Sequence, residues 1–277
     1  MEPAVEVRLP GGVVADGDRR TAVRLRRLTG HDQEALLGLA GAPPARAARV
    51  LLDRCLGSIG GREPDGDPVA GLTVGDREAL LWQLRAISLG DRIAAVVECR
   101  HCHEKLDLEL RVGDLLQPPY PVWSASFTED LAGHRIRFRL PTVADQEAVG
   151  GIARADAEAA ARTLLARCVL AVDDHPPGDH ELAAVRSAVE DRMATLDPQA
   201  EATLDLRCPE CDTPSAHALD AAEFLVEELT STSRHLYREV HALAWHYHWS
   251  ELDILGLTVD RRRRYLDLIQ DSLGAPA

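Results

Sequence analysis

Apolar and polar residues alternate in two short stretches that lie 113 positions apart along the chain. One stretch is Val23–Arg26 and the other is Ile136–Arg139. Alternation with a period of two is typical of a half-buried β-strand. The strand-like segments Val5–Leu9 and Trp123–Phe127 come shortly before them. The pattern therefore predicts a strand or hairpin at the start of each half of the chain.

Helical patterns follow each predicted hairpin. Thr29 and Thr142 each precede acidic or glutamine residues by a few positions, which is the signature of a helix N-cap. A second helix ends at Cys55 in the first half and at Cys168 in the second, and a segment rich in Gly, Pro and Asp comes next. We expect the following helix of the first half to be amphipathic. The predicted third helices are Val74–Leu89 and Glu181–Leu196.

The chain repeats itself at this fixed offset. Residues 47–55 and 160–168 are identical at seven of nine positions, and Asp32–Ala35 falls on Asp145–Ala148 without a gap. Self-similarity at one offset indicates internal duplication. Each half also closes with a Cys-x-x-Cys between two strand-like runs. The sequence therefore predicts an α+β protein made of two duplicated strand-plus-helix lobes.

The last part of the chain has no counterpart in the repeat. Its periodicity predicts helices only, and Ser250 with Asp253 forms a capping-box pattern. We therefore divide the chain into a first repeat at residues 1–116, a second repeat at residues 117–221 and an all-helical C-terminal segment at residues 222–277.

Four of the six cysteines form two Cys-x-x-Cys pairs, which are Cys99 with Cys102 and Cys208 with Cys211. The two-residue spacer lets both thiolates of a tight turn face one ion, and zinc prefers four such ligands in a tetrahedron. Because the pairs occupy equivalent places in the two halves, we predict one shared, zinc-ribbon-like site for a structural Zn²⁺. The long separation of the pairs makes this site a staple that clamps the lobes, not a self-contained finger.

Four other interpretations of the cysteine pairs stay open, the last of which is a site that has lost its metal. In the first interpretation, the bound ion is iron instead of zinc. In the second, a ligand comes from His101, His103 or His217. The third is thioredoxin-like thiol chemistry, which the flanking strands disfavour because such a motif begins a helix.

Composition limits the partners and the compartment. The net charge is −14, and Lys105 is the only lysine among the basic residues. This charge repels phosphate backbones, so nucleic acid is not the expected partner. No apolar run of about 18 residues occurs and the N-terminus does not look like a signal peptide, so we expect a cytoplasmic protein without a membrane span. Paired cysteines in a reducing cytoplasm favour metal over disulfides.

No catalytic motif is recognisable. The chain contains no Gly-rich phosphate loop, no Gly-x-Ser-x-Gly and no His-Glu-x-x-His. His241 and His248 could share a helix face, but surface histidines are the favoured interpretation. Cys55 and Cys168 are expected to be small buried thiols. We therefore predict that the protein is not an enzyme.

The C-terminal segment concentrates aromatic and arginine side chains. Concentrated aromatics and arginines are typical of partner-binding surfaces. The run of four arginines that begins at Arg261 also allows an alternative function, a zinc-ribbon regulator that binds nucleic acid. The predicted partner-binding residues are Trp245, Tyr247, Trp249, Arg261, Arg262 and Tyr265.

Two parts of the sequence resemble phage baseplate proteins. Glu239–Glu251, Asp253–Leu255 and Arg262–Leu266 resemble the C-terminus of small baseplate proteins of phage tails and phage-tail-like contractile injection systems. Leu72–Glu78, with the helix and the Cys99-x-x-Cys102 motif after it, is similar to the T-even myophage baseplate hub assembly chaperone family. The resemblance implies that the protein interacts with hub, wedge or spike proteins and that it has no catalytic residue. A permanent subunit and a transient assembly factor both fit it.

Overall fold

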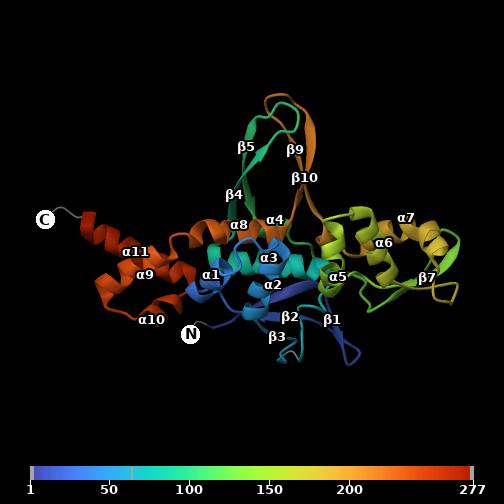
Figure 1. Ribbon diagram of the computed structural model, residues 1–277, viewed down its shortest axis with the longest axis horizontal. Helices are drawn as coiled ribbons and strands as arrows, with labels where there is room; N and C mark the ends of the chain where they lie inside the picture. The colour runs from blue at the N-terminus through green and yellow to red at the C-terminus, as the bar shows by residue number, and fades with distance from the viewer. Residues whose placement is uncertain (1–2, 64, 275–277) are drawn as a thin grey trace.

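The computed structural model describes residues 3–63 and 65–274. Figure 1 shows an elongated body from which two β-hairpins project together as an arm. The first lobe lies in the middle of the body, the second lobe at one end and the C-terminal helices at the other. Small antiparallel sheets and helices make the chain α+β, as the sequence predicts. In the described part of the chain, no helix is both long and apolar enough to cross a bilayer.

The first lobe is a three-stranded antiparallel sheet covered by helices. Its elements are β1 (Val5–Ala15), β2 (Asp18–Leu25), α1 (Gly30–Leu37), α2 (Pro44–Cys55), β3 (Leu56–Ile59) and α3 (Val74–Leu89). The sheet order is β1-β2-β3, and Ile59 pairs with Val23. The segment rich in Gly, Pro and Asp that follows α2 begins with strand residues, because β3 completes the sheet.

The second lobe has the same order of elements. They are β6 (Phe127–Leu131), β7 (His134–Phe138), α5 (Val143–Ala153), α6 (Ala157–Cys168), β8 (Val169–Val172) and α7 (Asp179–Leu196), with sheet order β6-β7-β8. The predicted strand Trp123–Phe127 was wrong, because the hairpin begins only at Phe127. Trp123 instead packs against Tyr120 and over Gly11, where a Cβ would lie 2.6 Å from its ring.

The positions that repeat in sequence form the same ionic cluster in each lobe. In the first lobe, Asp32 accepts hydrogen bonds from Arg26 (2.6 and 2.8 Å), from Arg54 (2.7 Å) and from the Thr29 N–H (2.9 Å). The cluster joins the end of β2, the start of α1 and the end of α2. Two guanidinium groups and one backbone N–H thus meet at one buried carboxylate, and Arg54 comes from 22 positions further along the chain.

The second lobe builds its cluster from the residues 113 positions later. Asp145 accepts hydrogen bonds from Arg139, from Arg167 (2.8 Å) and from the Thr142 N–H (3.0 Å). Both threonines are N-caps with a capping box, as predicted. The repeated residues therefore fix how each hairpin meets its helices.

Helix α3 is the central helix of the body, and its prediction as an amphipathic helix was wrong. Trp82 and Asp76 are fully buried, and the charged residues Glu78 and Arg85 are also buried. Arg85 donates to Glu228 at 2.9 and 3.0 Å. Asp76 reaches across to the irregular part of β1, where both of its oxygens accept backbone N–H groups. A helix covered on all sides buries charges only when each is paired in this way.

The two lobes meet directly at the N-termini of α3 and α5. The Val74 N–H donates to the Pro141 carbonyl at 3.2 Å, and the Val143 N–H donates to the Leu72 carbonyl at 3.0 Å. Asp197, which ends α7, accepts the Gly75 N–H at 3.0 Å. The lobes therefore hold each other through these direct contacts, and the clamp formed by a metal ion stays a prediction.

The C-terminal helices follow the second lobe in sequence but pack against the first lobe in space. Helix α8 (Ala221–Ser233) packs its leucines into the core of that lobe. A separate apolar cluster joins α9 (Leu236–Tyr247), α10 (Glu251–Leu255) and α11 (Val259–Gly274). The Gly30 N–H and the Leu257 carbonyl form a hydrogen bond of 3.3 Å that ties this end of the body to the first lobe.

Candidate metal centre

The arm consists of two antiparallel hairpins from distant parts of the chain (Figure 1). Its strands are β4 (Arg92–Glu98), β5 (Lys105–Arg111), β9 (Ala202–Arg207) and β10 (Pro214–Leu219). Exposed and less exposed residues alternate along all four strands. Each hairpin therefore has one polar face and one partly covered face, and each turn carries one Cys-x-x-Cys.

The two cysteine turns follow the same backbone path. In the first, the His103 N–H donates to the Cys99 carbonyl at 2.9 Å, and in the second the Asp212 N–H donates to the Cys208 carbonyl at 2.9 Å. His103 and Asp212 have positive φ angles of 61° and 55°. A left-handed residue directly after the second cysteine closes each turn. The sequence repeat of the motif is thus also a repeat of its local structure.

The structure brings all four predicted ligand sulfurs together. The Sγ atoms of Cys99 and Cys211 are 3.7 Å apart, and those of Cys102 and Cys208 are 3.6 Å apart. All four sulfurs lie within 4.8 Å of one another. A tetrahedral ion with metal–sulfur bonds of about 2.3 Å separates its ligands by roughly 3.8 Å. The spacing fits a four-coordinate metal ion and is too long for a disulfide.

Hydrogen bonds within the two turns also shift the pKa values of the thiols. The Cys102 N–H lowers the pKa of the Cys99 thiol, and the hydroxyl and N–H of Thr213 lower the pKa of Cys211 to about 6. The Glu104 N–H lowers the pKa of Cys102, but burial and the other three sulfurs outweigh it and raise this pKa to about 12. Four adjacent thiolates repel one another, and a cation removes that repulsion. The donor set could therefore hold a metal ion.

A comparison with known protein families matches residues 8–226 to the family described as T4 bacteriophage base plate protein. This match covers well over half of the chain. The chain belongs to the T4 bacteriophage base plate protein family. The family region includes both lobes, both cysteine turns and the first half of α8, and it ends before α9. Comparisons with curated proteins and with solved structures gave no match.

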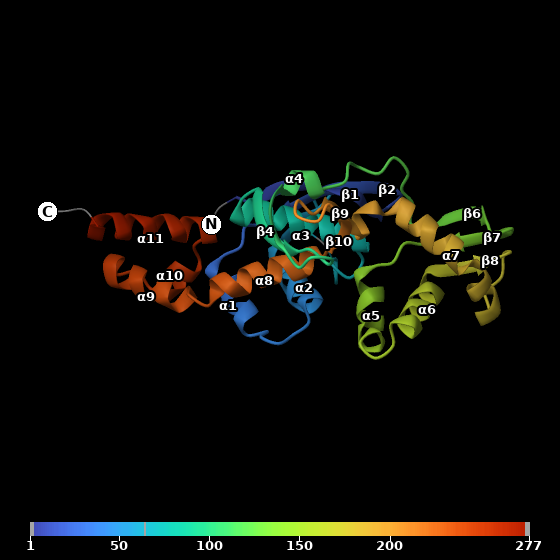
Figure 2. The same ribbon diagram turned by 90° about the horizontal axis from the view of Figure 1, so that it is seen from above.

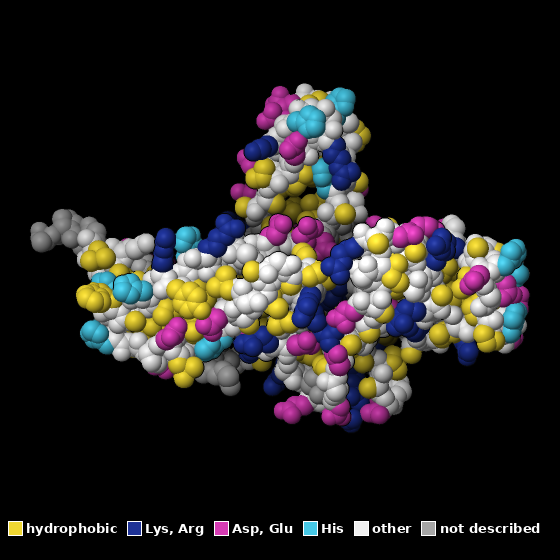
Figure 3. All heavy atoms as spheres, in the orientation of Figure 1, with side chains coloured by type: hydrophobic (Ala, Val, Ile, Leu, Met, Phe, Trp, Pro, Cys, Tyr) yellow, Lys and Arg dark blue, Asp and Glu magenta, His cyan; other side chains and the backbone are white. Residues whose placement is uncertain are grey.

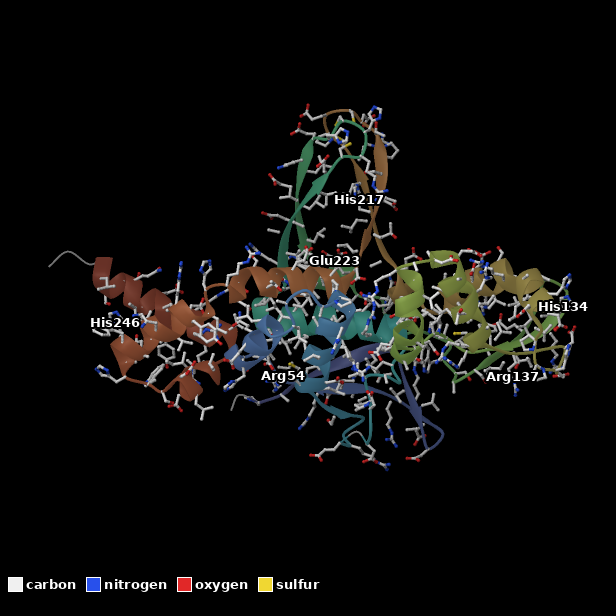
Figure 4. All side chains as sticks on the ribbon, viewed as in Figure 1. Arg54, His134, Arg137, His217, Glu223 and His246 are labelled. Carbon is white, nitrogen blue, oxygen red and sulfur yellow. The ribbon has the colours of Figure 1, made fainter. Side chains whose placement is uncertain are left out.

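The alternative ligands lie apart from the sulfur cluster. Nδ1 of His103 is 2.7 Å from Oε1 of Glu98, and Nε2 of His217, which lies on the arm (Figure 4), is 2.9 Å from the Ser215 hydroxyl. Among the described residues, the four cysteines are the one group of ligand side chains close enough to share an ion. Neither cysteine pair begins a helix, which is the feature that activates a thioredoxin-like thiol.

The two cysteines outside the arm are core residues, as predicted. Cys55 and Cys168 are buried at the ends of α2 and α6. Burial raises the pKa of Cys55 to about 12 and that of Cys168 to about 11. Neither thiol is ionised at neutral pH, so both act as small apolar groups.

The predicted partner-binding aromatics divide into two groups. Trp245 on α9 is 73% exposed. Tyr247, Trp249 and Tyr265 pack against one another, with ring centroids 4.8 to 5.5 Å apart. These three rings are partly buried and hold α11 against the end of α9. Trp245 therefore remains the aromatic side chain of this group that is most open to a partner.

The prediction that Arg262 faces a partner was wrong. Its side chain is 1% exposed, donates to Glu239 at 2.7 Å and also donates to the Gln33 side chain. Arg262 thus joins α11 to α9 and to the first lobe. Arg264 pairs with Asp260 at 2.8 Å, whereas Arg261 is exposed. Burial of Arg262 removes one arginine from the predicted basic surface, whereas Arg261, Arg263 and Arg264 stay exposed.

The sequence did not reveal a cleft between α2 and α5. Arg46 and Arg154 both line it. They are more than a hundred positions apart, and neither belongs to a motif. No local pattern signals that the two side chains share a site.

Proposed function

We propose that the protein is a non-enzymatic component of the baseplate of a contractile injection system, where it binds hub, wedge or spike proteins. The observation that carries this proposal is the family match, because it spans both lobes and the arm as one unit. The projecting arm and the exposed Trp245 provide surfaces for protein contacts. A baseplate is held together by such contacts, so this role requires no catalytic group.

The ion at the four cysteines is Zn²⁺ in this proposal. Four thiolates in a tetrahedron suit zinc, and they also suit iron. Zinc bound in this way contributes on the order of 10–16 kcal/mol at neutral pH. The described arm has few buried apolar side chains, with Leu106 and the cysteines forming the small cluster at its tip. Metal ligation would therefore supply the rigidity that packing does not.

The metal proposal is tested by elemental analysis of freshly purified protein. We expect one zinc per chain, and Cys208→Ser should lower that content strongly. Cys168→Ala removes a cysteine outside the cluster and should leave the zinc content unchanged. One iron per chain together with a visible absorption band would show that the ion is iron instead of zinc. Freshly purified protein that contains no metal would refute the proposed metal site.

The assembly proposal is tested in the producing strain. Deletion of the gene should abolish assembled sheathed particles, and the tagged protein should co-purify with hub, wedge or spike proteins. Normal particles in the deletion strain would refute the proposal. The protein in purified particles would identify a permanent subunit, whereas its presence only in precursor complexes would identify an assembly chaperone.

We also infer that the two lobes arose by internal duplication. The shared order of elements, the two cysteine turns and the ionic clusters of Asp32 and Asp145 support this inference. An experimental structure in which the backbones of the two lobes follow different paths would contradict it.

A further inference from the structure

A cleft with a volume of about 560 Å³ lies between the two lobes. Helix α2 provides one wall with Pro43 and Ala45 before and within its first turn, and α5 provides the other with Val143. Helices α2 and α5, which form its walls, lie on the same side of the body as α1 and α6 (Figure 2). A largely apolar cleft of this size between two lobes is the usual form of a binding site.

Three guanidinium groups surround this apolar cleft. Arg77 lies inside, where it donates to Gln146 at 2.6 Å and to Glu78. Arg46 and Arg154 are exposed at the rim, and within residues 3–63 and 65–274 neither side chain has a hydrogen bond or an ion pair. In Figure 3, Lys and Arg side chains gather over the middle of the body, where the first lobe meets α5 and α6.

The one acidic residue of the cleft does not neutralise the rim. Glu147 pairs with Arg49 at 2.9 Å. The cleft is therefore locally positive on a chain whose net charge is −14. A local charge of opposite sign to the whole molecule selects a ligand by complementarity.

Two glycines keep the α5 wall open. Gly150 and Gly151 line the cleft, and a Cβ at either position would meet no atom within 4 Å. A bound chain can therefore lie close to the α5 backbone. The unfilled space also allows a blocking substitution that does not disturb the packing of α5.

We propose that this cleft binds an acidic, aliphatic peptide segment of a partner protein. Its carboxylates pair with Arg46 and Arg154, and its aliphatic side chains lie between Pro43 and Val143. The mostly apolar lining suits aliphatic side chains better than a phosphate backbone, and the net negative charge of the chain repels nucleic acid. This inference goes beyond the proposed baseplate role, because the chemistry of the cleft is independent of the identity of the assembly.

The test measures peptide binding to the purified full chain by fluorescence anisotropy. The probe is a labelled eight-residue peptide that alternates leucine and glutamate. A leucine–lysine peptide and a glycine–glutamate peptide are its matched controls. We expect the leucine–glutamate peptide to bind at least fivefold more tightly than either control, because it alone has both the charge and the apolar groups.

Variants place the binding in the cleft. Arg46→Ala with Arg154→Ala should weaken binding of the leucine–glutamate peptide by about fivefold or more, since two exposed ion pairs are lost. Gly151→Trp should abolish binding by filling the space. Arg137→Ala, an exposed arginine of β7 at the far end of the second lobe (Figure 4), should leave binding unchanged.

Several results would overturn the inference. They are no binding of the leucine–glutamate peptide at millimolar concentration, equal binding of the leucine–lysine peptide, and equal binding by the Gly151→Trp variant. Binding of labelled single-stranded DNA that depends on Arg46 and Arg154, without peptide binding, would reassign the cleft to nucleic acid. Circular dichroism of each variant shows whether its fold is retained. Loss of sheathed particles plays no part in this test, so the two proposals fail separately.

Discussion

Replacing Asp32 should measurably destabilise the first lobe. This carboxylate is fully buried and accepts hydrogen bonds from Arg26, Arg54 and the Thr29 N–H. Asp32→Asn keeps the size of the side chain and removes its charge. The substitution therefore isolates the contribution of the ionised carboxylate to the free energy of unfolding.

The magnitude follows from the acidity of the group. Burial raises the pKa of Asp32, but the hydrogen bonds from Arg26 and Arg54 outweigh burial and lower the pKa from 3.8 to about 2. One pKa unit corresponds to ~1.4 kcal/mol, so we expect Asp32→Asn to lower the free energy of unfolding by about 2–3 kcal/mol at pH 7. Asp32→Ala also leaves guanidinium groups without a partner and should cost about 3–5 kcal/mol.

The pH dependence gives the sign of the effect. A carboxylate whose pKa is lowered by folding contributes its full stabilisation above the pKa of the unfolded chain, here 3.8, and loses it as the pH falls through about 2. The difference between wild type and Asp32→Asn should therefore shrink to about half at pH 3.

Urea unfolding followed by circular dichroism at pH 7 and pH 3 measures this difference. Asp205→Asn on the exposed face of β9 is the matched control and should change stability by no more than about 0.5 kcal/mol. Equal stability of Asp32→Asn and wild type at pH 7, or a difference that does not decrease on acidification, would falsify the ionic explanation of the cluster.

Further predictions concern the second lobe, the lobe junction, the arm and the C-terminal helices. Asp145→Asn should destabilise the second lobe in the same direction, and an unchanged urea midpoint would contradict the equivalence of the two clusters. Gly75→Ala places a Cβ 1.8 Å from Oδ1 of Asp197 and should cost about 1–3 kcal/mol, whereas Gly113→Ala has free space and should not. Removal of the proposed zinc with a chelator should make the arm susceptible to limited proteolysis and leave the main unfolding transition of the body unchanged. Loss of that transition would show that the stability of the body requires the ion. Trp245→Ala should leave the unfolding midpoint unchanged and weaken the free energy of binding to baseplate partners by about 2 kcal/mol or more, which would lower the amount of partner that co-purifies. Unchanged co-purification would show that Trp245 on α9 is not part of the interface.

The sequence alone determined the features that depend on local chemistry. Alternating positions in Val23–Arg26 and Ile136–Arg139 give a strand its two faces, so both segments could be recognised as strands. Thr29 and Thr142 are N-caps because the cap bonds reach only three residues ahead. The Cys-x-x-Cys turns are local as well. Their equivalent positions in the repeat were enough to predict that the four sulfurs meet.

Only the tertiary structure decided what depends on which segments cover one another. Helix α3 carries charged residues as a surface helix does, yet it is central because α8 and β1 supply partners for Arg85 and Asp76. Arg262 belongs to an exposed-looking run, and it is buried because Gln33 and Glu239 receive its guanidinium. The cleft between Arg46 and Arg154 exists only where the lobes dock. Such burial and pairing result from contacts between distant segments, and no periodicity along the chain encodes them.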